Sequence, residues 1–314
     1  VGISATAYSV TSTLEEDMNT VLVLGGYGFI GRHIVRQLRA QSVNVLIGTR
    51  AKGRSLNVGE RRVVMHKMLC VSQWLELLTG VDAVVNSVGI LRARQGESFE
   101  QVHHQSVSAL SQACEKKYVR LVHISALGLD NPLKSAFAQS KRDGEQAIMR
   151  GTADWHIVRA SLVEGEQGYG ARWFRRMAGW PIHFAPNDAR GLICPVHVDQ
   201  LAKTVVKVAL STKPTLLKKN RVIEVGGEHL FCLFAYLQHL RGKPPVLRIR
   251  VPARLSRWFA YILDFFHATP YSYGHYEILK YDNYPAALTG HVTSRRIPLK
   301  EGVLTIARPA DVRL

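Results

Sequence analysis

Short apolar runs alternate with stretches of helical periodicity from residue 19 to residue 161. Runs that are apolar throughout are typical of parallel strands buried on both faces, whereas apolar residues spaced three and four apart indicate helices. The expected strands are Thr20–Leu24, Val43–Thr49, Val63–Met68, Asp82–Val88, Arg120–Ser125 and Trp155–Arg159. The expected helices are residues 31–40, Val71–Thr79, Ser98–Lys117 and Phe137–Arg150.

This alternation predicts an α/β fold, a doubly wound parallel Rossmann sheet with helices on both faces. In such sheets ligands bind beyond the carboxyl ends of the strands. After Ser161 the regularity falls, and only scattered elements are expected: helices over 196–210, 230–240 and 255–266, and a strand over 222–225. We expect a Rossmann domain over 19–161 and a smaller C-terminal, substrate-side lobe over 162–314, interleaved with the last Rossmann elements.

Residues 1–18 are expected to form a disordered leader before the fold. They are rich in Ser, Thr and Ala, and their acidic residues Glu15, Glu16 and Asp17 argue against a transit peptide. They also lack the apolar core of a signal peptide. Either Met18 is the true start of the protein, or the leader is a loose arm.

The strongest chemical signal is a glycine-rich turn between the first strand and the first helix. It holds two overlapping spacings, Gly26-x-Gly28-x-x-Gly31 and Gly25-x-x-Gly28-x-x-Gly31. In this setting glycines allow a tight turn, close approach of a pyrophosphate to the backbone, and packing of the helix on the strand. Free N–H groups at the helix start then hold the anion. We expect a dinucleotide on Gly25, Gly26, Tyr27, Gly28, Phe29, Ile30 and Gly31; the alternative is a turn without a ligand.

The end of the second strand bears on which dinucleotide binds. It reads Gly48-Thr49-Arg50, where NAD-preferring folds carry an acidic residue for the ribose hydroxyls. Arg50 stands there instead, followed by Lys52 and Arg54. Because a guanidinium can hold a 2′-phosphate through two parallel hydrogen bonds, NADP(H) is favoured over NAD(H). A merely solvated basic loop is the alternative. The fourth strand ends in residues expected along the cofactor, Ser87, Val88 and Gly89.

The charge balance widens the range of partners. The chain has 41 Lys and Arg against 24 Asp and Glu, a net charge of +17, which attracts phosphorylated cofactors, acidic lipids, nucleic acid or acidic proteins. Residues 172–180 and 254–266 mix basic and aromatic side chains, as in segments that lie on membranes, although core packing would use the same aromatics. No RNA-recognition motif occurs, so nucleic acid is not expected. We expect a cytoplasmic protein with a peripheral contact to the inner membrane or to a membrane complex.

Other features exclude further classes of site. No apolar run reaches about eighteen residues, so no transmembrane helix is expected. The cysteines Cys70, Cys114, Cys194 and Cys232 are widely spaced, which indicates buried thiols in a reducing compartment. No HExxH motif occurs and no metal is expected. The pair His103-His104 is interpreted as structural, because neighbours on a helix point in different directions.

Taken together, the motifs resemble a known family. The chain is similar to the atypical, extended short-chain dehydrogenases/reductases of epimerase/dehydratase-like type. More narrowly, it resembles bacterial relatives of the NAD(P)H-binding accessory subunit of respiratory complex I. The resemblance covers roughly residues 19–285. The segments that carry it are 25–31, 86–89, 123–126, 140–141, 155–161, 195–199, 224–227 and, more loosely, 277–283.

The resemblance also exposes a departure. Active members use Tyr-x-x-x-Lys together with a serine, and here Ser125 and Lys141 match the serine and the lysine, but Phe137 stands at the tyrosine position. Phenylalanine has no proton to donate, and general acid–base catalysis typically contributes roughly 10²–10⁴ in rate. The family pattern implies that Lys141 still holds the nicotinamide ribose. A strand-end cap at Ser125 and a surface charge at Lys141 are the alternatives.

The sequence therefore predicts nucleotide binding without the usual chemistry. The main hypothesis is a complex I-associated subunit, assembly factor or sensor in which NADP(H) stabilises the fold. One alternative is an active NADP-dependent reductase, or an epimerase-like enzyme for nucleoside sugars, with a substituted general acid. Candidates for that acid are Tyr169, His183 and His197. A binding module for membranes or nucleic acid is the other alternative.

Overall fold

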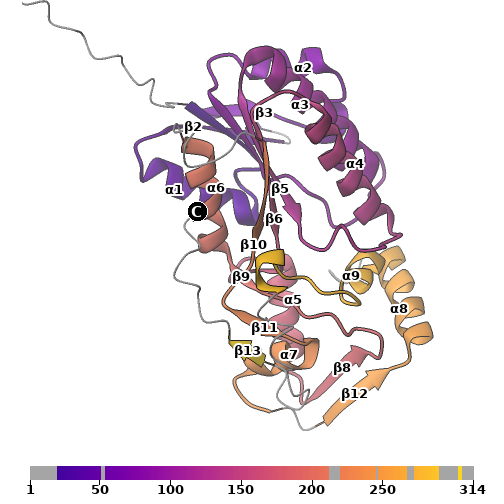
Figure 1. Ribbon diagram of the computed structural model, residues 1–314. Helices are drawn as coiled ribbons and strands as arrows, with labels where there is room; N and C mark the ends of the chain where they lie inside the picture. The colour runs from indigo at the N-terminus through magenta and orange to yellow at the C-terminus, as the bar shows by residue number, and fades with distance from the viewer. Residues whose placement is uncertain are drawn as a thin grey trace, which may run out of the picture.

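One parallel sheet organises the larger part of the molecule. The computed structural model describes residues 20–50, 54–211, 220–244, 247–266, 272–289 and 303–305. Seven strands pair in the order β10-β6-β5-β4-β1-β2-β3, and every neighbouring pair is parallel (Figure 1). They are β1 (Thr20–Leu24), β2 (Asn44–Thr49), β3 (Glu60–Arg62), β4 (Ala83–Asn86), β5 (Arg120–Ala126), β6 (Trp155–Ala160) and β10 (Arg221–Val225). The predicted doubly wound Rossmann sheet is confirmed.

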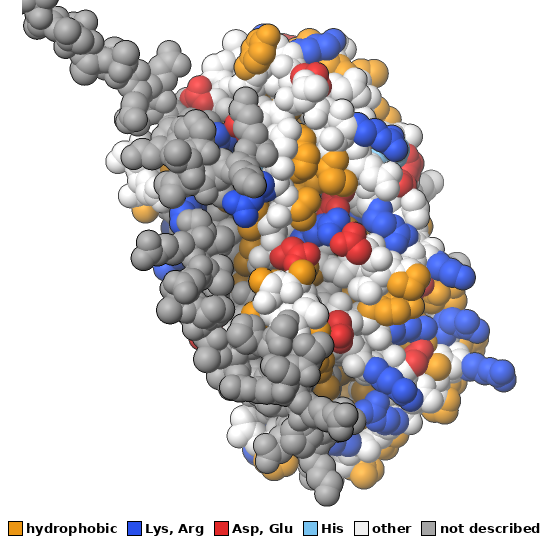
Figure 2. Space-filling view, in the orientation of Figure 1, with side chains coloured by type: hydrophobic (Ala, Val, Ile, Leu, Met, Phe, Trp, Pro, Cys, Tyr) orange, Lys and Arg blue, Asp and Glu red, His pale blue; other side chains and the backbone are white. Residues whose placement is uncertain are grey.

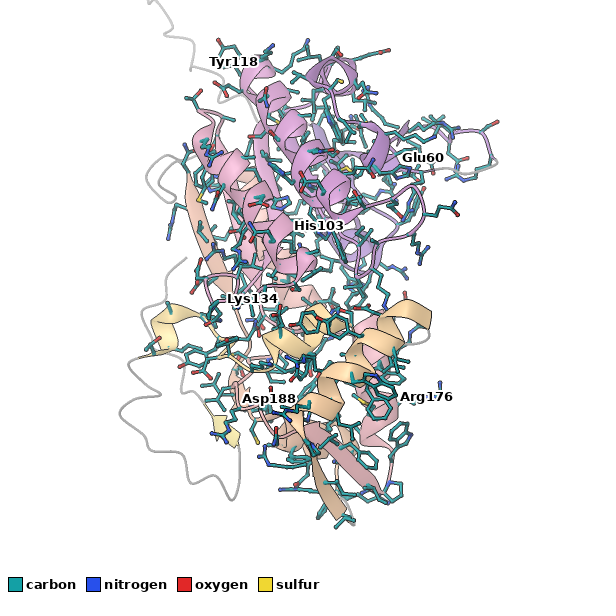
Figure 3. All side chains as sticks on the ribbon, turned by 90° about the vertical axis from the view of Figure 1, so that its right-hand side faces the viewer. Glu60, His103, Tyr118, Lys134, Arg176 and Asp188 are labelled. Carbon is teal, nitrogen blue, oxygen red and sulfur yellow. The ribbon has the colours of Figure 1, made fainter. Side chains whose placement is uncertain are left out.

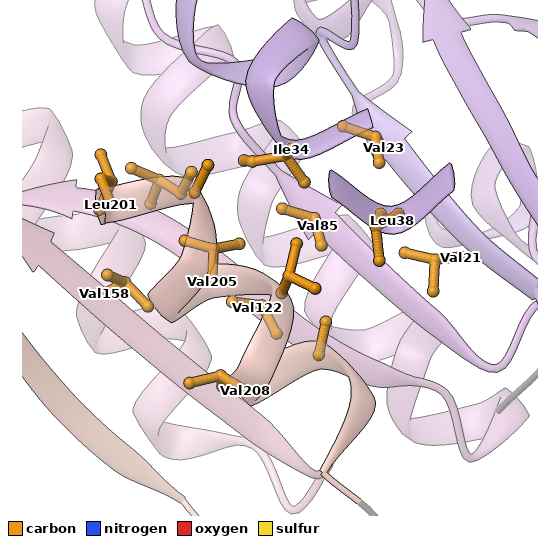
Figure 4. Packing of buried hydrophobic residues seen from close by; sticks show 14 of the residues in the cluster. Val21, Val23, Ile34, Leu38, Val85, Val122, Val158, Leu201, Val205 and Val208 are labelled. Atoms are coloured by element: carbon orange, nitrogen blue, oxygen red, sulfur yellow. The ribbon is translucent and has the colours of Figure 1, made fainter. Parts of the chain in front are cut away.

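Alternation along each strand sends side chains to two separate cores. In β1, Val21 and Val23 face α1 and α6, whereas Leu22 and Leu24 join the core on the opposite side (Figure 4). The first core is covered by α1 (Phe29–Arg39) and α6 (Val198–Leu210), the second by α2 (Val71–Leu77), α3 (Ser106–Lys117) and α4 (Ala136–Arg150). Burial on both faces explains why these strands are apolar throughout.

Several predicted boundaries were wrong. The third strand is Glu60–Arg62, not Val63–Met68, and Met65–Lys67 forms a 3₁₀ helix. As an edge strand, β3 pairs only with β2, so charged residues are tolerated in it, while the apolar Val63, Met65 and Met68 fill the core from a loop. The expected helix 98–117 begins with a π-helical stretch, Glu100–Gln105.

The chain after Ala160 returns to the sheet once and otherwise builds a second layer. Its β10 is the sheet's edge strand and its α6 packs on α1. The remaining elements lie beyond the carboxyl ends of the strands (Figure 1). They are β7 (Val163–Glu164), α5 (Tyr169–Ala178), β8 (Ile182–Pro186), β9 (Val196–His197), β11 (His229–Phe231), α7 (Leu233–Arg241), β12 (Leu247–Val251), α8 (Ala253–Phe266), α9 (Tyr273–Ile278), the 3₁₀ helix Ala286–Leu288 and β13 (Val303–Thr305).

These elements correct two further expectations. The segment expected as a helix from 196 is first a short strand that pairs with β7, and the helix begins at Val198. The segment expected as a helix from 230 is first the strand β11, paired with β13, before α7 begins at Leu233. The expected leader 1–18 lies outside the described residues.

The cysteines and the helix lengths complete the picture. All four cysteines are free; Cys114 and Cys194 are buried and Cys232 is half-buried, but Cys70 is exposed, so the expectation of four buried thiols was wrong. Among the described residues, no helix has both the length and the apolar character needed to cross a bilayer.

Candidate functional site

The glycine turn at the end of β1 forms a cradle that larger residues would fill. Gly25 has a φ of +73°, and the N–H of Gly28 donates to its carbonyl at 2.7 Å. A Cβ on Gly31 would lie 2.2 Å from the oxygen of Gly25, and one on Gly26 would lie 2.9 Å from Ile47. Gly25 therefore makes the tight turn, and Gly31 allows α1 to approach the strand.

The start of α1 is open to an anion. Gly28 is the N-cap, it makes no side-chain cap, and no acidic residue lies in the first turn. The neighbouring Phe29 and Ile30 line the cavity described below together with Gly28. Since the first N–H groups of a helix have no partner within it, they are available to phosphate oxygens.

The basic residues after β2 are already engaged with carboxylates. Arg50 Nη1 lies 3.3 Å from Glu97 Oε1, and Arg54 makes two bonds of 2.7 and 2.9 Å to Glu60. Glu60 also accepts from the hydroxyl of Tyr27, and these partners hold its pKa well below the usual range. Glu60, labelled in Figure 3, and Glu97 were not anticipated as neighbours of these arginines. Lys52 lies outside the described residues.

The segment after β4 lines the cavity from the sheet side. The Ser87 hydroxyl donates to the carbonyl of Leu24 at 2.6 Å, and the N–H of Val88 donates to Asn86 Oδ1 at 3.1 Å. These bonds fix the loop that follows β4 against the end of β1. The strand order of the sheet reverses at this point, between β1 and β4. Ser87, Val88 and Gly89 all line the cavity, at the position where doubly wound sheets bind their ligands.

Ser125, Lys141 and Phe137 meet in the same cavity. The Ser125 hydroxyl oxygen is buried and has no hydrogen-bond partner among the described residues. The Lys141 ammonium lies 5.8 Å from the centre of the Phe137 ring. Burial lowers the pKa of Lys141 to about 8, against the opposing attraction of Glu145. A buried cation and a buried hydroxyl without partners form a polar patch that a ligand can satisfy.

The His103 side chain is held beside this patch by two hydrogen bonds. Its Nε2 accepts from the N–H of Ile90 at 3.0 Å, and its Nδ1 lies 3.2 Å from Ser140 Oγ. Burial and the Lys141 charge hold its pKa well below the usual range, so the ring is neutral. The next residue, His104, points outward and bonds Glu100, close to Asp143, as expected for neighbours that face different ways.

The cavity extends well beyond the glycine turn. Its volume is about 460 Å³, and it lies between the carboxyl ends of the sheet strands and the C-terminal elements. Apart from Ser125, Lys141 and a few others, its walls are apolar. The residues contributed from the far side are Leu162, Val163, Trp173, Phe174, Ile193, Ile278 and Leu279.

One cavity residue was missed from the sequence. His275, on α9, stacks on Phe137 with ring centres 5.8 Å apart, and its Nδ1 lies 2.6 Å from Ser272 Oγ. Burial lowers its pKa to about 4. The suggested His183 and His197 do not line the cavity: His183 is buried against the carbonyl of Ala178, and His197 caps α6. The side chain of Tyr169 lies outside the description.

Hydrogen bonds from the segment 277–283 hold α9 against the cavity. The Glu277 carboxylate accepts from the N–H groups of Lys134 and Ser135, the latter at 2.7 Å. Asn283 donates to the carbonyl of Leu127 at 2.8 Å and accepts from the Ser161 hydroxyl. The Glu277 bonds join α9 to the amino end of α4, which carries Phe137 and Lys141, and the Asn283 bonds join this segment to the residues that follow β5 and β6.

Comparison with known proteins shows what this chain is similar to. The sequence model of the NAD(P)H-binding family matches residues 25–175. The chain is 28% identical over 241 residues to a ceramide reductase of Caulobacter vibrioides, covering 75% of each protein. It is 27% identical over 187 residues to the mitochondrial NADH-ubiquinone oxidoreductase 40 kDa subunit of Neurospora crassa, covering 57% of this chain and 49% of that protein. The chain thus spans about half of the fungal subunit.

A solved structure extends the likeness to the fold. The UDP-N-acetylglucosamine 4-epimerase of Bacillus cereus superposes with a TM-score of 0.56 at 18% identity, covering 83% of this chain and 95% of that one. The likeness therefore includes the C-terminal elements as well as the sheet.

Proposed function

We propose that this chain is an atypical short-chain dehydrogenase/reductase that holds NADP(H) mainly as a stabilising cofactor, and its similarity to the NAD(P)H-binding family over residues 25–175 supports this. The observation that carries the proposal is that the Ser125 hydroxyl, which has no hydrogen-bond partner among the described residues, and Lys141 line the same cavity as Gly28 of the glycine turn. The resemblance implies that Lys141 holds the nicotinamide ribose and that Ser125 polarises a substrate carbonyl. The residues present fit such a cofactor, because it would supply the partners that this patch lacks.

The expected role follows from Phe137. Its ring stands beside Lys141, packed between His103 and His275, and it offers no proton. Both histidines are neutral near pH 7. We propose a subunit, assembly or sensor role at a membrane-bound complex, and the similarity to the complex I subunit supports this.

The proposal predicts stabilisation without turnover. Adding NADPH at about a hundredfold excess over its Kd should raise the free energy of unfolding by about 3 kcal/mol, and hence Tm by about 5 °C. Differential scanning fluorimetry measures the shift, and absorbance at the nicotinamide band measures consumption. Phe137→Tyr restores the missing hydroxyl, and its consumption of NADPH is measured beside that of the wild-type protein. Absence of any shift with either nucleotide would contradict the proposal.

The apolar cavity favours a second candidate, a reductase for a long-chain carbonyl compound. The Caulobacter relative is named for ceramide, and the walls of this cavity suit an alkyl chain. When bound, the reduced nucleotide supplies a hydride to the carbonyl carbon. The Ser125 hydroxyl would donate a hydrogen bond to the carbonyl oxygen, and the Lys141 ammonium, with its pKa of about 8, would donate the proton. Steady consumption of NADPH with a long-chain ketone, lost in Lys141→Met, would favour this candidate over the first.

We also propose that Arg50 selects NADP(H), by exchanging Glu97 for the 2′-phosphate. Arg50→Ala should weaken NADPH binding by roughly tenfold and leave NADH binding unchanged, because only the phosphate offers the guanidinium a charged acceptor. Isothermal titration with both nucleotides measures this. Arg61→Ala is the control, since Arg61 donates to the carbonyl of Thr79. Equal losses for both nucleotides would place the 2′-position elsewhere.

A further inference from the structure

Helix α8 exposes several large apolar residues. Among its residues whose burial the structure describes, only the small Ser256 and Ala260 are buried, and Ile262 and Leu263 are half-buried. Its exposed positions include Trp258, 58% exposed, and Tyr261, 54% exposed, with Leu255 and Phe259 close behind. A helix in a globular protein normally buries such residues, and a contiguous exposed apolar patch marks an interaction site. We call the exposed residues of 243–261 the basic-aromatic face.

The charges on this face have one sign. Residues 241–263 contain six basic residues and no Asp or Glu. Lys243, Arg254 and Arg257 are exposed, and none of the six forms an ion pair within the described part of the chain. The guanidiniums of Arg248 and Arg250 instead lie over the Phe234 ring. Figure 2 shows Lys and Arg side chains gathered among apolar ones at the lower right, over β12 and α8.

Neighbouring elements extend the apolar part of the face. Strand β12 pairs with β8 and leads directly into α8. Leu247 on β12 and Phe184 on β8 are both about half exposed. Figure 3 shows β8, β12 and α8 together at one end of the molecule, with Tyr118 at the other.

We propose that the basic-aromatic face is a docking surface for a bilayer that contains anionic phospholipids. Trp and Tyr side chains are favoured at the level of the headgroups, where the ring is buried and its polar atom stays wet. Arg and Lys contribute about 1 kcal/mol each next to an anionic leaflet. An excess of positive charge around an aromatic cluster matches a sheet of phosphates with an apolar layer beneath it. On this proposal the protein lies on the membrane along α8.

The test uses the full chain and two kinds of vesicle, pure phosphatidylcholine and phosphatidylcholine mixed with phosphatidylglycerol. The wild-type protein should sediment with the mixed vesicles, and its tryptophan emission should shift to the blue. The double variant Arg254→Glu with Arg257→Glu should bind at least about tenfold more weakly. Trp258→Ser with Phe259→Ser should bind about tenfold more weakly, because both anchors are removed.

The controls lie at the opposite end of the molecule. Tyr118→Ser removes an aromatic that is even more exposed than Trp258, and Lys116→Glu with Lys117→Glu reverses two exposed charges. Both should bind the mixed vesicles like the wild-type protein. Absence of binding to mixed vesicles, equal binding to both vesicle types, or equal losses in the control variants would overturn the proposal. NADPH-induced stabilisation, measured on every variant, tests nucleotide binding separately, because the face lies outside the nucleotide cavity.

Discussion

Replacing Lys141 by methionine should make the nucleotide-free protein more stable at pH 7, by about 3 kcal/mol. The Lys141 ammonium is buried, and no hydrogen bond or ion pair to it occurs among the described residues. Burial lowers its pKa from 10.5 to about 8, and each pKa unit corresponds to about 1.4 kcal/mol. Methionine fills a similar volume without a charge, so the energetic cost disappears.

The gain should depend on pH in a defined direction. Above pH 10.5 the lysine is neutral in both the folded and the unfolded chain, and the variant has no advantage. As the pH falls below 10.5 the unfolded chain takes up the proton first, so the wild-type protein loses stability until about pH 8. Urea unfolding of both proteins between these limits measures the difference. Lys116→Met, at an exposed lysine, is the control, and a pH-independent difference would contradict the argument.

The same variant should lose nucleotide affinity. Hydrogen bonds to a charged partner contribute roughly 1.5–3 kcal/mol, so NADPH should bind Lys141→Met about thirtyfold more weakly. Opposite signs for stability and binding are the signature of a residue retained for its ligand. A variant with reduced stability and unchanged binding would show that Lys141 is a structural residue.

Gly31→Ala should reduce nucleotide affinity by about a hundredfold or more. The new Cβ would lie 2.2 Å from the oxygen of Gly25. Because this oxygen belongs to the backbone, it cannot move aside as the end of a flexible side chain could, so the start of α1 must move. Movement of that helix start removes several charge-assisted bonds to the phosphates at once. Overpacking should also lower the free energy of unfolding by about 1–3 kcal/mol. Isothermal titration and urea unfolding measure the two effects.

Gly179→Ala is the matched control for this substitution. A Cβ on Gly179 would meet the carbonyl of Arg176 at 3.4 Å, an ordinary contact, at the end of α5. It should leave affinity unchanged. If Gly31→Ala bound NADPH as well as this control does, the pyrophosphate would have to lie away from the start of α1.

The sheet and its glycine turn could be predicted because their signals are local. A buried parallel strand is apolar throughout, and a turn that needs Gly25 and Gly31 leaves a fixed spacing in the sequence. Edge strand β3 escaped prediction because pairing on one side only allows its residues to be charged. The position of β3 in the sheet, and not its composition, explains why these residues form a strand.

The rest of the site depends on contacts between distant segments. His275 reaches Phe137 only because Glu277 fastens α9 to the start of α4, and no periodicity records such a bond. Likewise Arg50 is paired with Glu97, which the loop sequence alone does not show. For the aromatics of 254–266 the sequence left core packing and membrane contact open, and the structure shows Trp258, Phe259 and Tyr261 exposed and therefore outside the core.

The burial of Lys141 without a hydrogen bond or ion pair among the described residues has a consequence for the lifetime of the protein in a cell. A chain held below its attainable stability has a larger unfolded fraction, and proteases remove molecules from that fraction. A nucleotide that pairs with the ammonium would shrink it. On the binding proposed above, supply of the dinucleotide would set how long each molecule survives, and a starved cell would clear the protein without a dedicated signal.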